Sequence, residues 1–143
     1  MCGIVGGVTN RDITPLLLDG LKRLEYRGYD SSGLVVLSNN NSFNRARSVG
    51  KVSNLEKNLN TRKDKIVGNI GIAHTRWATH GKPSNRNAHP HISNKVVAIV
   101  HNGIIENYLE LKEIQIKQGY KFTSDTDAEV VDYELDQLAI YRY

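Results

Sequence analysis

The chain has a single cysteine, Cys2, among its 143 residues. One cysteine can form no internal disulfide and no multi-cysteine zinc site, and this usage fits a reducing compartment, so we expect a cytoplasmic protein. Long hydrophobic runs are absent as well, since none approaches the ~18 apolar residues that a membrane span needs. The N-terminus also lacks the basic region and apolar stretch of a signal peptide. From these absences we expect no membrane partner, and the length suits a single core.

Aromatic side chains are scarce too, at 7% of the residues. Positive charge gathers in the middle of the chain, where residues 45–86 contain ten Lys or Arg and two acidic residues. Proteins that bind single-stranded nucleic acid interleave such charges with aromatic side chains, and Trp77 is the only aromatic residue in this range. We therefore expect no nucleic-acid partner. A small anionic ligand or a solvated loop explains the charge better.

The apolar pattern predicts strands and helices in one unit, because neither a repeat nor a linker interrupts it. Strands are expected over residues 2–9, 34–37, 70–73 and 96–100, and a further strand is expected to pair as a hairpin after the turn at 39–41. The β-branched run at 96–100 is typical of a central strand. The sequence therefore predicts a mixed α/β layer structure.

Four helices are expected among these strands. The first has Thr14 as its N-cap and Pro15 at the first helical position, and it stops at Gly28. A short helix is expected over 53–60, a third ends at Gly119, and the last opens at Thr126, which has capping-box spacing with Glu129. The apolar residues that define the last two helices are Leu109, Leu111, Ile114 and Ile116, and then Val131, Leu135 and Leu138.

Cys2 stands directly behind the initiator methionine. If Met1 is removed, one residue carries both a thiol and a free α-amino group, and the amine can accept the thiol proton directly or through a water. An α-amino group titrates near pH ~7.7–8.0 and a thiol near ~8.5, so modest activation at neutral pH is enough. The plain alternative is a small buried hydrophobic side chain near a terminus.

Polar clusters lie where the predicted strands end, and together they suit acyl transfer on an amide, which needs a nucleophile, oxyanion donors and handles for the substrate. Asn102 offers a side-chain amide, and Gly103 offers an unobstructed backbone N–H. Arg76 can grip a carboxylate by two parallel hydrogen bonds, and Asp127 can hold an ammonium. These two charges would suit the two charged ends of an amino acid.

Other interpretations of the same residues stay open. Histidines at 74, 80, 89 and 91 are numerous enough for a metal site, although their spacing matches no familiar ligand motif and no carboxylate lies nearby in the sequence. Asn102-Gly103 alone is more often a tight turn. Asp127 alone is more often a charge that complements the dipole at a helix start.

Six segments carry a resemblance to a known family: Met1–Gly6, Arg23–Ser31, Gly71–Gly81, Asn87–His91, His101–Asn107 and Ser124–Asp127. Together they resemble the glutaminase domain of the glutamine–fructose-6-phosphate aminotransferases, which are class II glutamine amidotransferases and N-terminal-nucleophile hydrolases. The match runs in register from Met1 to about Leu135. The resemblance implies an α+β fold, the α-β-β-α sandwich of these hydrolases.

The resemblance also implies roles for individual residues. Cys2 would attack the side-chain amide of glutamine with its own amino group as the base, and the Asn102 side chain and Gly103 N–H would bind the oxyanion. Arg76 would hold the carboxylate of glutamine and Asp127 its amino group.

A loop is implied to close over the bound glutamine. Trp77, Thr79 and His80 would lie on that loop, and Arg27 would help to position the loop that carries Cys2. Neither a cofactor nor a metal is expected.

Members of the family continue well beyond residue 143, with further strands that complete the sandwich and two sugar-isomerase domains that bind fructose 6-phosphate. We therefore expect residues 1–143 to be a truncated glutamine amidotransferase type 2 domain, with an incomplete sandwich and no sugar-isomerase domains. Residues 136–140 resemble a piece that the family carries much later. A large internal deletion and chance in an amphipathic helix explain that likeness equally well.

The expected reaction is hydrolysis of glutamine to glutamate and ammonia. Because strands would be missing, a sheet edge and a helix face would need cover, and a separate isomerase-bearing chain or a second copy of this chain is the expected partner. The alternative is a catalytically inactive remnant, or an interaction partner of a full-length aminotransferase.

Overall fold

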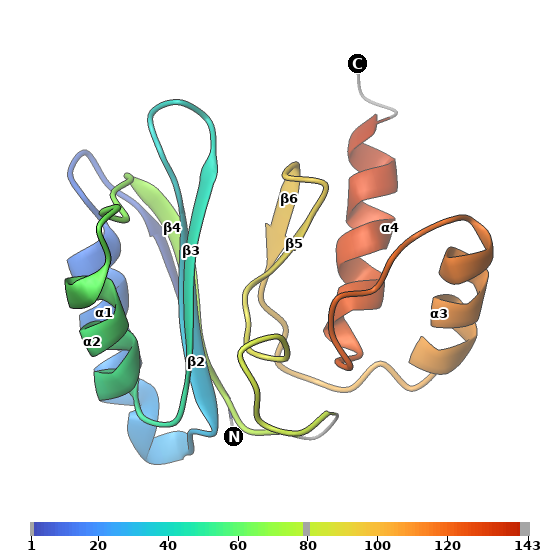
Figure 1. Ribbon diagram of the computed structural model, residues 1–143, viewed down its shortest axis with the longest axis horizontal. Helices are drawn as coiled ribbons and strands as arrows, with labels where there is room; N and C mark the ends of the chain where they lie inside the picture. Colours follow the sequence, from blue (N-terminus) through green and yellow to red (C-terminus); the bar gives the residue numbers. More distant parts are fainter. Residues whose placement is uncertain (1, 79–80, 141–143) are drawn as a thin grey trace.

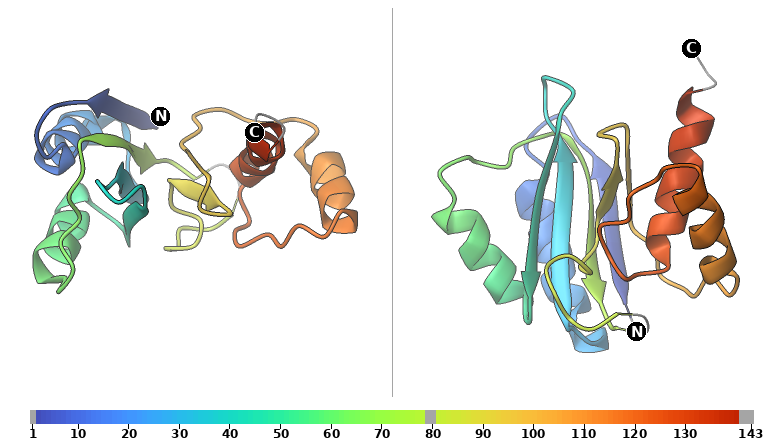
Figure 2. Two further views of the ribbon diagram at one scale, coloured as in Figure 1. Left: turned by 90° about the horizontal axis from the view of Figure 1, so that it is seen from above. Right: turned by 45° about the vertical axis from the view of Figure 1, so that its right-hand side comes forward.

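The computed structural model describes residues 2–78 and 81–140, which form four stacked layers (Figure 1, Figure 2). Two helices cover one face of a four-stranded sheet, a two-stranded sheet lies on its other side, and two further helices lie beyond that. This is the α-β-β-α order predicted from the sequence. The elements of the first two layers are the helices α1 (Thr14–Leu24) and α2 (Val52–Thr61) and the strands β1 (Gly3–Val8), β2 (Ser31–Leu37), β3 (Phe43–Val49) and β4 (Ile70–Arg76).

The larger sheet is antiparallel, with strand order β1-β4-β2-β3. Side chains alternate between its two faces, so Leu34, Val36 and Ala73 point to the helices while their neighbours point to the second sheet. The helices bury Leu17, Leu21 and Leu55 against this face, and all of these belong to one apolar cluster. Burial of apolar side chains on this side therefore supplies the main core.

The first helix begins one residue earlier than a Thr14 cap would require. Ile13 occupies the N-cap position, and the Thr14 hydroxyl donates instead to the carbonyl of Ile66 at 2.9 Å. Asp12 accepts the Thr14 N–H at 3.1 Å and thereby takes over the capping role. After α1 the chain makes one 3-10 turn, η1 (Glu25–Arg27), and this helical stretch ends at Gly28, as predicted.

The segment 86–90 crosses the inner face of the larger sheet and is fastened to β2 and β3. Arg45 Nη1 donates to the Pro90 carbonyl at 3.1 Å, and Arg47 Nη1 donates to the Ala88 carbonyl at 3.0 Å. Gly33 permits this close approach, because a Cβ there would lie 2.2 Å from the carbonyl oxygen of His89. The absence of a side chain at Gly33 thus lets the two layers meet.

The second sheet consists of β5 (His91–Ser93) and β6 (Val97–Ile99), paired antiparallel. The prediction of a central strand over 96–100 was wrong: β6 has three residues and, in the part of the chain described, pairs only with β5. Two strands cover the four-stranded sheet incompletely. Ile4, Val8 and Ile70 therefore remain exposed on its inner face.

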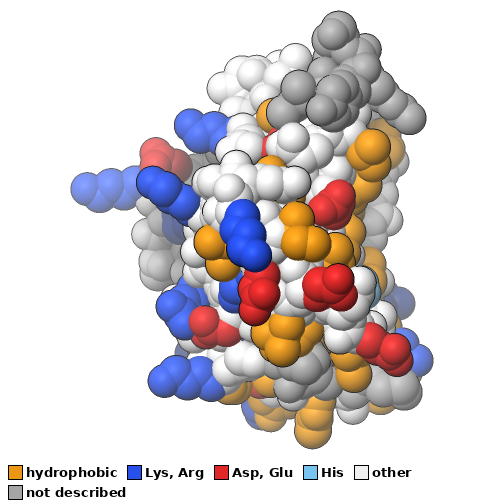
Figure 3. Space-filling model, turned by 90° about the vertical axis from the view of Figure 1, so that its right-hand side faces the viewer, with side chains coloured by type: hydrophobic (Ala, Val, Ile, Leu, Met, Phe, Trp, Pro, Cys, Tyr) orange, Lys and Arg blue, Asp and Glu red, His pale blue; other side chains and the backbone are white. Residues whose placement is uncertain are grey.

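Helix α3 (Tyr108–Lys117) ends near Gly119 as expected, but its apolar residues do not form a buried stripe. Gln115 is its buried residue, whereas Leu109, Ile114 and Ile116 are exposed. Figure 3 shows hydrophobic side chains lying among charged ones on this side of the molecule. Nowhere in residues 2–78 and 81–140 is a helix long and apolar enough to cross a membrane.

Helix α4 (Ala128–Ile140) packs on the second sheet with an acidic face. Glu129, Asp132 and Asp136 are buried, whereas Leu138 of the predicted apolar stripe is 62% exposed. Glu129 also departs from the predicted capping box with Thr126. Its carboxylate accepts instead from the backbone N–H groups of Thr123 and Ser124, each at 2.7 Å.

Asp132 carries the main electrostatic cost of this interface. Burial raises the pKa of its carboxyl to about 7, and the charges of Glu129 and Asp136 add to the rise, while the Ser93 backbone and Arg45 oppose it. The folded state therefore keeps a proton that the unfolded state releases between the ordinary value of 3.8 and about 7. The free energy of unfolding therefore falls as pH rises through that window, because the buried carboxyl must then lose its proton.

We expect Gly33→Ala to lower the free energy of unfolding by about 3 kcal/mol, because its Cβ would collide with backbone rather than with a flexible side chain. Gly6→Ala is the matched control on β1 of the same sheet, where the nearest atom to a new Cβ is Ile72 Cγ2 at 3.4 Å. Urea denaturation of both variants measures the difference. Equal losses in the two would contradict the contact between β2 and the segment 86–90.

We expect Asp132→Asn to stabilise the protein at pH 8 by about 1–2 kcal/mol and to have little effect at pH 5, since the wild-type carboxyl is charged only in the first case. Glu113→Gln removes the same charge from an exposed position of α3 and serves as the control. Denaturation midpoints across pH 5–8 give the result. A variant equally stabilised at both pH values would contradict a buried carboxyl that titrates.

Candidate functional site

The segments predicted to carry chemistry converge at one end of the sandwich, the lower end in Figure 1. The start of β1, the end of β4, the connection that follows β6 and the start of α4 all reach this end. In the antiparallel pairing of β1 with β4, Gly3 stands opposite Thr75. Continued by one residue, that register brings Cys2 to the level of Arg76.

Cys2 is half-buried and held by the turn that follows β4. Its Sγ accepts a hydrogen bond from the backbone N–H of Trp77 at 3.2 Å and lies 3.7 Å from the Trp77 carbonyl oxygen. The next residue is fixed as well, because the Gly3 N–H donates to Thr75 Oγ1 at 3.1 Å. The backbone N–H of Trp77 thus fixes where the sulfur lies.

Asn102 and Gly103 lie on the connection after β6, on the other side of Cys2. The Asn102 side-chain amide donates to the Cys2 carbonyl oxygen at 3.4 Å, across a separation of 100 residues. A Cβ on Gly103 would lie 3.1 Å from Nε2 of His101, so a side chain there would press on the His101 ring. One of the two predicted oxyanion donors, the Asn102 amide, thus contacts the residue that carries the predicted nucleophile.

Asp127 is buried at the start of α4 and ties that helix to the same connection. Its Oδ2 accepts the backbone N–H of Ile105 at 2.8 Å. The hydrogen bond fixes the position of the chain two residues beyond Gly103. The Asp127 carboxylate, which was predicted to hold an ammonium group, therefore also fixes the backbone of the connection that carries Asn102 and Gly103.

Arg76 is buried at the end of β4, and its surroundings reveal a residue that sequence reasoning did not single out, Asp30. Arg76 Nη1 lies 3.7 Å from Asp30 Oδ1, and Arg76 Nη2 donates to the Gly81 carbonyl at 2.9 Å. Asp30 also accepts from the Ala78 N–H and, at 2.7 Å, from the Ser31 hydroxyl. Asp30 occurs in a polar, glycine-rich loop, and no spacing distinguishes it there from a solvated acid.

Trp77 and Arg27 lie on two loops that touch each other. Gly28, directly after Arg27, has φ +117°, and a Cβ on it would lie 2.1 Å from Cε3 of Trp77. The indole therefore rests on the backbone of Gly28 and remains 56% exposed. Arg27 is exposed beside this contact. Thr79 and His80, which were also predicted to lie on this loop, fall outside the described residues.

Three of the four histidines considered for a metal site, His74, His89 and His91, form a buried stack, and the fourth, His80, lies outside the described residues. The ring centroids of His74 and His89 are 4.4 Å apart, and those of His89 and His91 are 4.5 Å apart. Burial lowers the pKa of His74 to about 4 and that of His91 to about 3. Within the described residues no three His, Cys, Asp or Glu side chains are grouped so that they could hold a metal ion.

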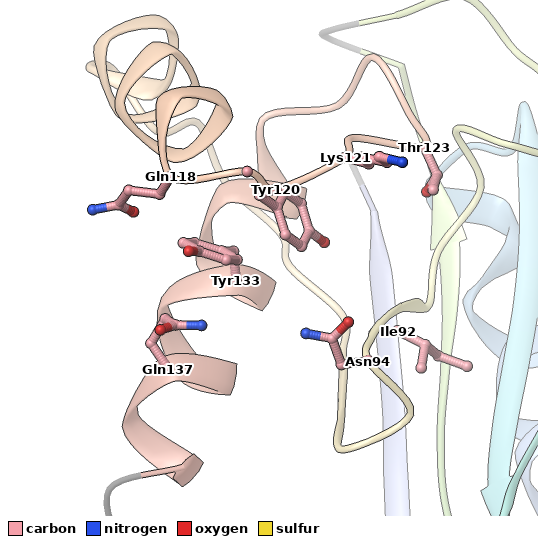
Figure 4. Close-up of a pocket in the computed structure, with 9 residues that line it drawn as sticks. Ile92, Asn94, Gln118, Tyr120, Lys121, Thr123, Tyr133 and Gln137 are labelled. Atoms are coloured by element: carbon pink, nitrogen blue, oxygen red, sulfur yellow. The ribbon is translucent and has the colours of Figure 1, made fainter.

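A separate pocket of about 460 Å³ lies between α4, the connection before it and the β5–β6 turn (Figure 4). Tyr120 and Tyr133 face each other in it, with ring centroids 4.4 Å apart, and burial raises the pKa of Tyr120 to about 12. None of its lining residues is a predicted site residue, and none is a nucleophile of the kind found at Cys2. The groups suited to amide chemistry therefore lie at the Cys2 end.

The arrangement at Cys2 meets the needs of acyl transfer on an amide. The Cys2 sulfur accepts a hydrogen bond from the Trp77 N–H, and the Cys2 carbonyl oxygen accepts one from a side-chain amide. A buried guanidinium and a buried carboxylate lie on the elements that border Cys2. Donors fixed in advance around a developing oxyanion lower the barrier for such reactions. A substrate with both an acidic and an ammonium group would match the two charges.

Comparison with known proteins agrees with this chemistry. Residues 56–138 match the glutamine amidotransferase domain family. The chain is 60% identical over 131 residues to a glutamine–fructose-6-phosphate aminotransferase (isomerizing) of Pseudomonas putida, covering 92% of this chain and 21% of that protein. It is 59% identical over 135 residues to the protein of the same name from Buchnera aphidicola, covering 94% of this chain and 22% of that protein. The chain thus spans about a fifth of the length of these relatives.

Solved structures share the fold. One is a glutamine phosphoribosylpyrophosphate amidotransferase from B. subtilis in complex with ADP and GMP, with a TM-score of 0.67 and 27% identity over 90% of this chain and 27% of that one. Another, described as the allosteric regulatory enzyme of purine biosynthesis, gives a TM-score of 0.72 and 27% identity over 92% of this chain and 28% of that one. These likenesses agree with the predicted N-terminal-nucleophile hydrolase fold.

We expect Gly28→Ala to displace the Trp77 indole and to change the rate at which iodoacetamide alkylates Cys2, because the Trp77 N–H contacts the sulfur. Trp77 is the only tryptophan in the chain, so its fluorescence and acrylamide quenching report the displacement directly. Gly119→Ala is the control, since Gly119 has a comparable φ of +94° but nothing within 4 Å of a new Cβ. Unchanged fluorescence in Gly28→Ala would contradict the contact.

Proposed function

We propose that this chain, which belongs to the glutamine amidotransferase domain family, hydrolyses glutamine to glutamate and ammonia with Cys2 as its nucleophile. The observation that carries the proposal is the position of Cys2 between two hydrogen-bond donors. Trp77 N–H reaches Sγ at 3.2 Å, and the Asn102 amide reaches the Cys2 carbonyl oxygen at 3.4 Å. A cysteine that served only as a packing residue would need neither contact.

Removal of Met1 is the first requirement of the proposed mechanism, because it frees the α-amino group of Cys2. That amine takes the thiol proton, and the sulfur attacks the carbonyl carbon of the glutamine side chain. The carbonyl oxygen becomes an oxyanion, which the Asn102 amide and the Gly103 N–H stabilise. The amine then returns the proton to the departing nitrogen, and ammonia leaves behind a thioester on Cys2.

Water completes the reaction. The α-amino group of Cys2 accepts a proton from the water, whose oxygen attacks the thioester carbon, and the same oxyanion donors stabilise the second tetrahedral intermediate. Cleavage of the C–S bond releases glutamate, and the proton held by the α-amino group passes to the sulfur and restores the thiol. Each step of the proposed mechanism uses only residues of this chain.

Recognition of glutamine requires two charges of opposite sign. In the proposal Arg76 pairs with the α-carboxylate and Asp127 with the α-ammonium, while Trp77, Thr79 and His80 form the cover. Arg27 acts indirectly, because it precedes the glycine on which the Trp77 indole rests. Both charged side chains are buried, which strengthens their attraction to the substrate relative to water.

Ammonia needs an acceptor in an amidotransferase. The name of the curated relatives gives fructose 6-phosphate as a substrate of those proteins. By analogy, ammonia made at Cys2 would pass to a sugar phosphate on an isomerase-bearing segment or chain. A separate isomerase-bearing chain, or a second copy of this chain, is the proposed protein partner.

The test is a glutaminase assay on protein whose N-terminal mass shows that Met1 is absent. We expect glutamate release that disappears in Cys2→Ala and falls about 10²-fold or more in kcat in Asn102→Ala, as for the loss of an oxyanion donor. Asn107→Ala is the matched control, since Asn107 precedes α3 and makes no capping hydrogen bond. Its activity should equal that of the unaltered protein.

Two outcomes would contradict the proposal. The first is the absence of glutamate release together with no labelling of Cys2 by the glutamine-like electrophile 6-diazo-5-oxo-L-norleucine, which would favour the non-catalytic alternative. The second is full activity in protein that demonstrably retains Met1, because the amine that serves as base would then be blocked.

A further inference from the structure

Three imidazoles form a continuous stack between the layers, and the proposed mechanism gives them no role. His74 comes from β4 of the larger sheet, His91 begins β5 of the smaller one, and His89 lies between their rings. Centroid separations of 4.4 and 4.5 Å place the rings in direct contact. All three side chains are buried. The stack therefore spans the gap between the two sheets.

One end of the stack lies next to Arg76. His74 precedes Arg76 by two residues on β4, and side chains two apart on a strand project to the same face. The charge of Arg76 contributes to lowering the pKa of all three histidines, which agrees with its closeness to the stack. The His74 ring and the Arg76 side chain therefore lie next to each other on the same face of β4.

The other end of the stack is joined to the residue before Asp127. His91 Nε2 and Thr126 Oγ1 are 2.9 Å apart, and Thr126 Oγ1 and Ser124 Oγ are also 2.9 Å apart. Ser124 donates its hydroxyl proton to the Glu129 carboxylate at 2.5 Å.

These contacts fix the direction of the chain of hydrogen bonds. Because Ser124 has already given its proton to Glu129, the Thr126 hydroxyl must donate to Ser124, and Thr126 must accept from His91 Nε2–H. The network thus assigns the protonated nitrogen of His91. It fastens the stack to the start of α4, one residue from Asp127.

The middle ring makes contacts of a different kind. Neither ring nitrogen of His89 has a hydrogen-bond partner among residues 2–78 and 81–140, and burial holds its pKa well below the ordinary value. An uncharged ring between two uncharged rings packs without repulsion, and the edge-to-face contact with His91, at 72°, is a favourable aromatic geometry. The backbone of His89 is fixed too, since its carbonyl oxygen closely approaches Gly33.

We propose that the His74–His89–His91 stack is a spacer that sets the separation of Arg76 from Asp127 and thereby positions the two charges that hold the amino acid. The inference rests on the proposed function, in which those charges bind glutamine. The histidines are positioning residues, because none of them is assigned a contact with the substrate. Arg76 belongs to the larger sheet and Asp127 to the start of α4, so their separation depends on what lies between the layers.

The spacer model can be tested by changing the size of the side chain at position 89. His89→Phe keeps an uncharged ring of similar size, whereas His89→Ala removes the ring and lets the layers approach. We expect His89→Ala to raise KM for glutamine about tenfold with a change in kcat below about threefold, because misplaced charges weaken binding before they affect the sulfur chemistry. His89→Phe should stay within about threefold of the unaltered protein in both constants.

Two further variants sharpen the interpretation. Thr126→Val keeps the shape of the side chain but breaks the link from His91 to Ser124, and it should raise KM in the same direction as His89→Ala. Val52→Ala removes buried volume from the helix-side core, far from the stack, and is the control for a loss of stability alone. It should leave KM unchanged at temperatures where the protein remains folded.

Labelling of Cys2 separates this inference from the proposed function. Iodoacetamide needs no amino-acid recognition, whereas 6-diazo-5-oxo-L-norleucine carries the charged groups of glutamine. We expect His89→Ala to slow labelling by the second reagent about tenfold and to leave labelling by the first unchanged.

Each remaining outcome decides one of the two ideas. If both labelling rates fall together in His89→Ala, or neither falls, the spacer role is overturned. The same holds if His89→Phe is as impaired as His89→Ala. If unaltered protein without Met1 reacts with iodoacetamide but not with the glutamine analogue, the proposed function itself fails.

Discussion

The antiparallel pairing of β1 with β4 is the constraint on which the rest of the site depends. It aligns the first residues of the chain with the end of a strand more than seventy residues away, so Gly3 stands opposite Thr75. The Trp77 N–H can then reach the Cys2 sulfur at 3.2 Å. A register shift of one residue would turn every side chain of β1 to the other face and remove this contact. Because strand pairing in a buried sheet is cooperative, the position of Cys2 depends on the core that holds the sheet.

Two kinds of interaction divide the molecule. The helix-side core is apolar and close-packed, whereas the layers between the larger sheet and α4 are joined by buried polar groups: arginines of β3, the histidine stack and the acidic face of α4. Buried charged groups contribute little net stability unless they are well paired, but they fix geometry strictly. The polar half therefore resembles a binding site more than a core.

The titrating groups of the polar half make the stability of the fold sensitive to pH. As pH falls below the ordinary pKa of histidine, the unfolded state takes up protons that the buried rings do not accept, so folding becomes less favourable. As pH rises toward neutral, the buried Asp132 carboxyl has to ionise, which also makes folding less favourable.

The sequence predicted the elements better than it predicted their surroundings. Periodicity located α2, α3 and the hairpin of β2 and β3, because local pattern alone decides their existence. It also located α4, but it chose the wrong buried face, because the apolar residues of α4 are partly exposed while Glu129 and Asp132 are buried. The partner surface and not the local pattern decides which face of a helix is buried. Likewise, β-branched composition identified β6 as a strand but carries no information on how many strands flank it. Chemical type indicated five of the predicted site residues, whereas Arg27, Trp77, Thr79 and His80 came only from the family resemblance. Asp30 was missed because its value lies in its contacts with Arg76 and the Ala78 N–H, which no local spacing encodes.

The separation of apolar core and polar site has a consequence for activity. The larger sheet is incompletely covered: Ile4, Val8 and Ile70 are exposed, and an apolar recess of about 140 Å³ opens beside Val35, Leu37 and Phe43. Apolar surface of this kind lowers the stability gained on folding, yet none of these residues belongs to the contacts that hold Cys2, Asn102 or Asp127. The contacts around Cys2 at one end of the sandwich are thus separate from the exposed sheet face, provided that the sheet itself stays paired. In the proposed spacer model, the quantity that matters for amino-acid binding is instead the distance between the layers, because Arg76 and Asp127 belong to elements on opposite sides of that gap.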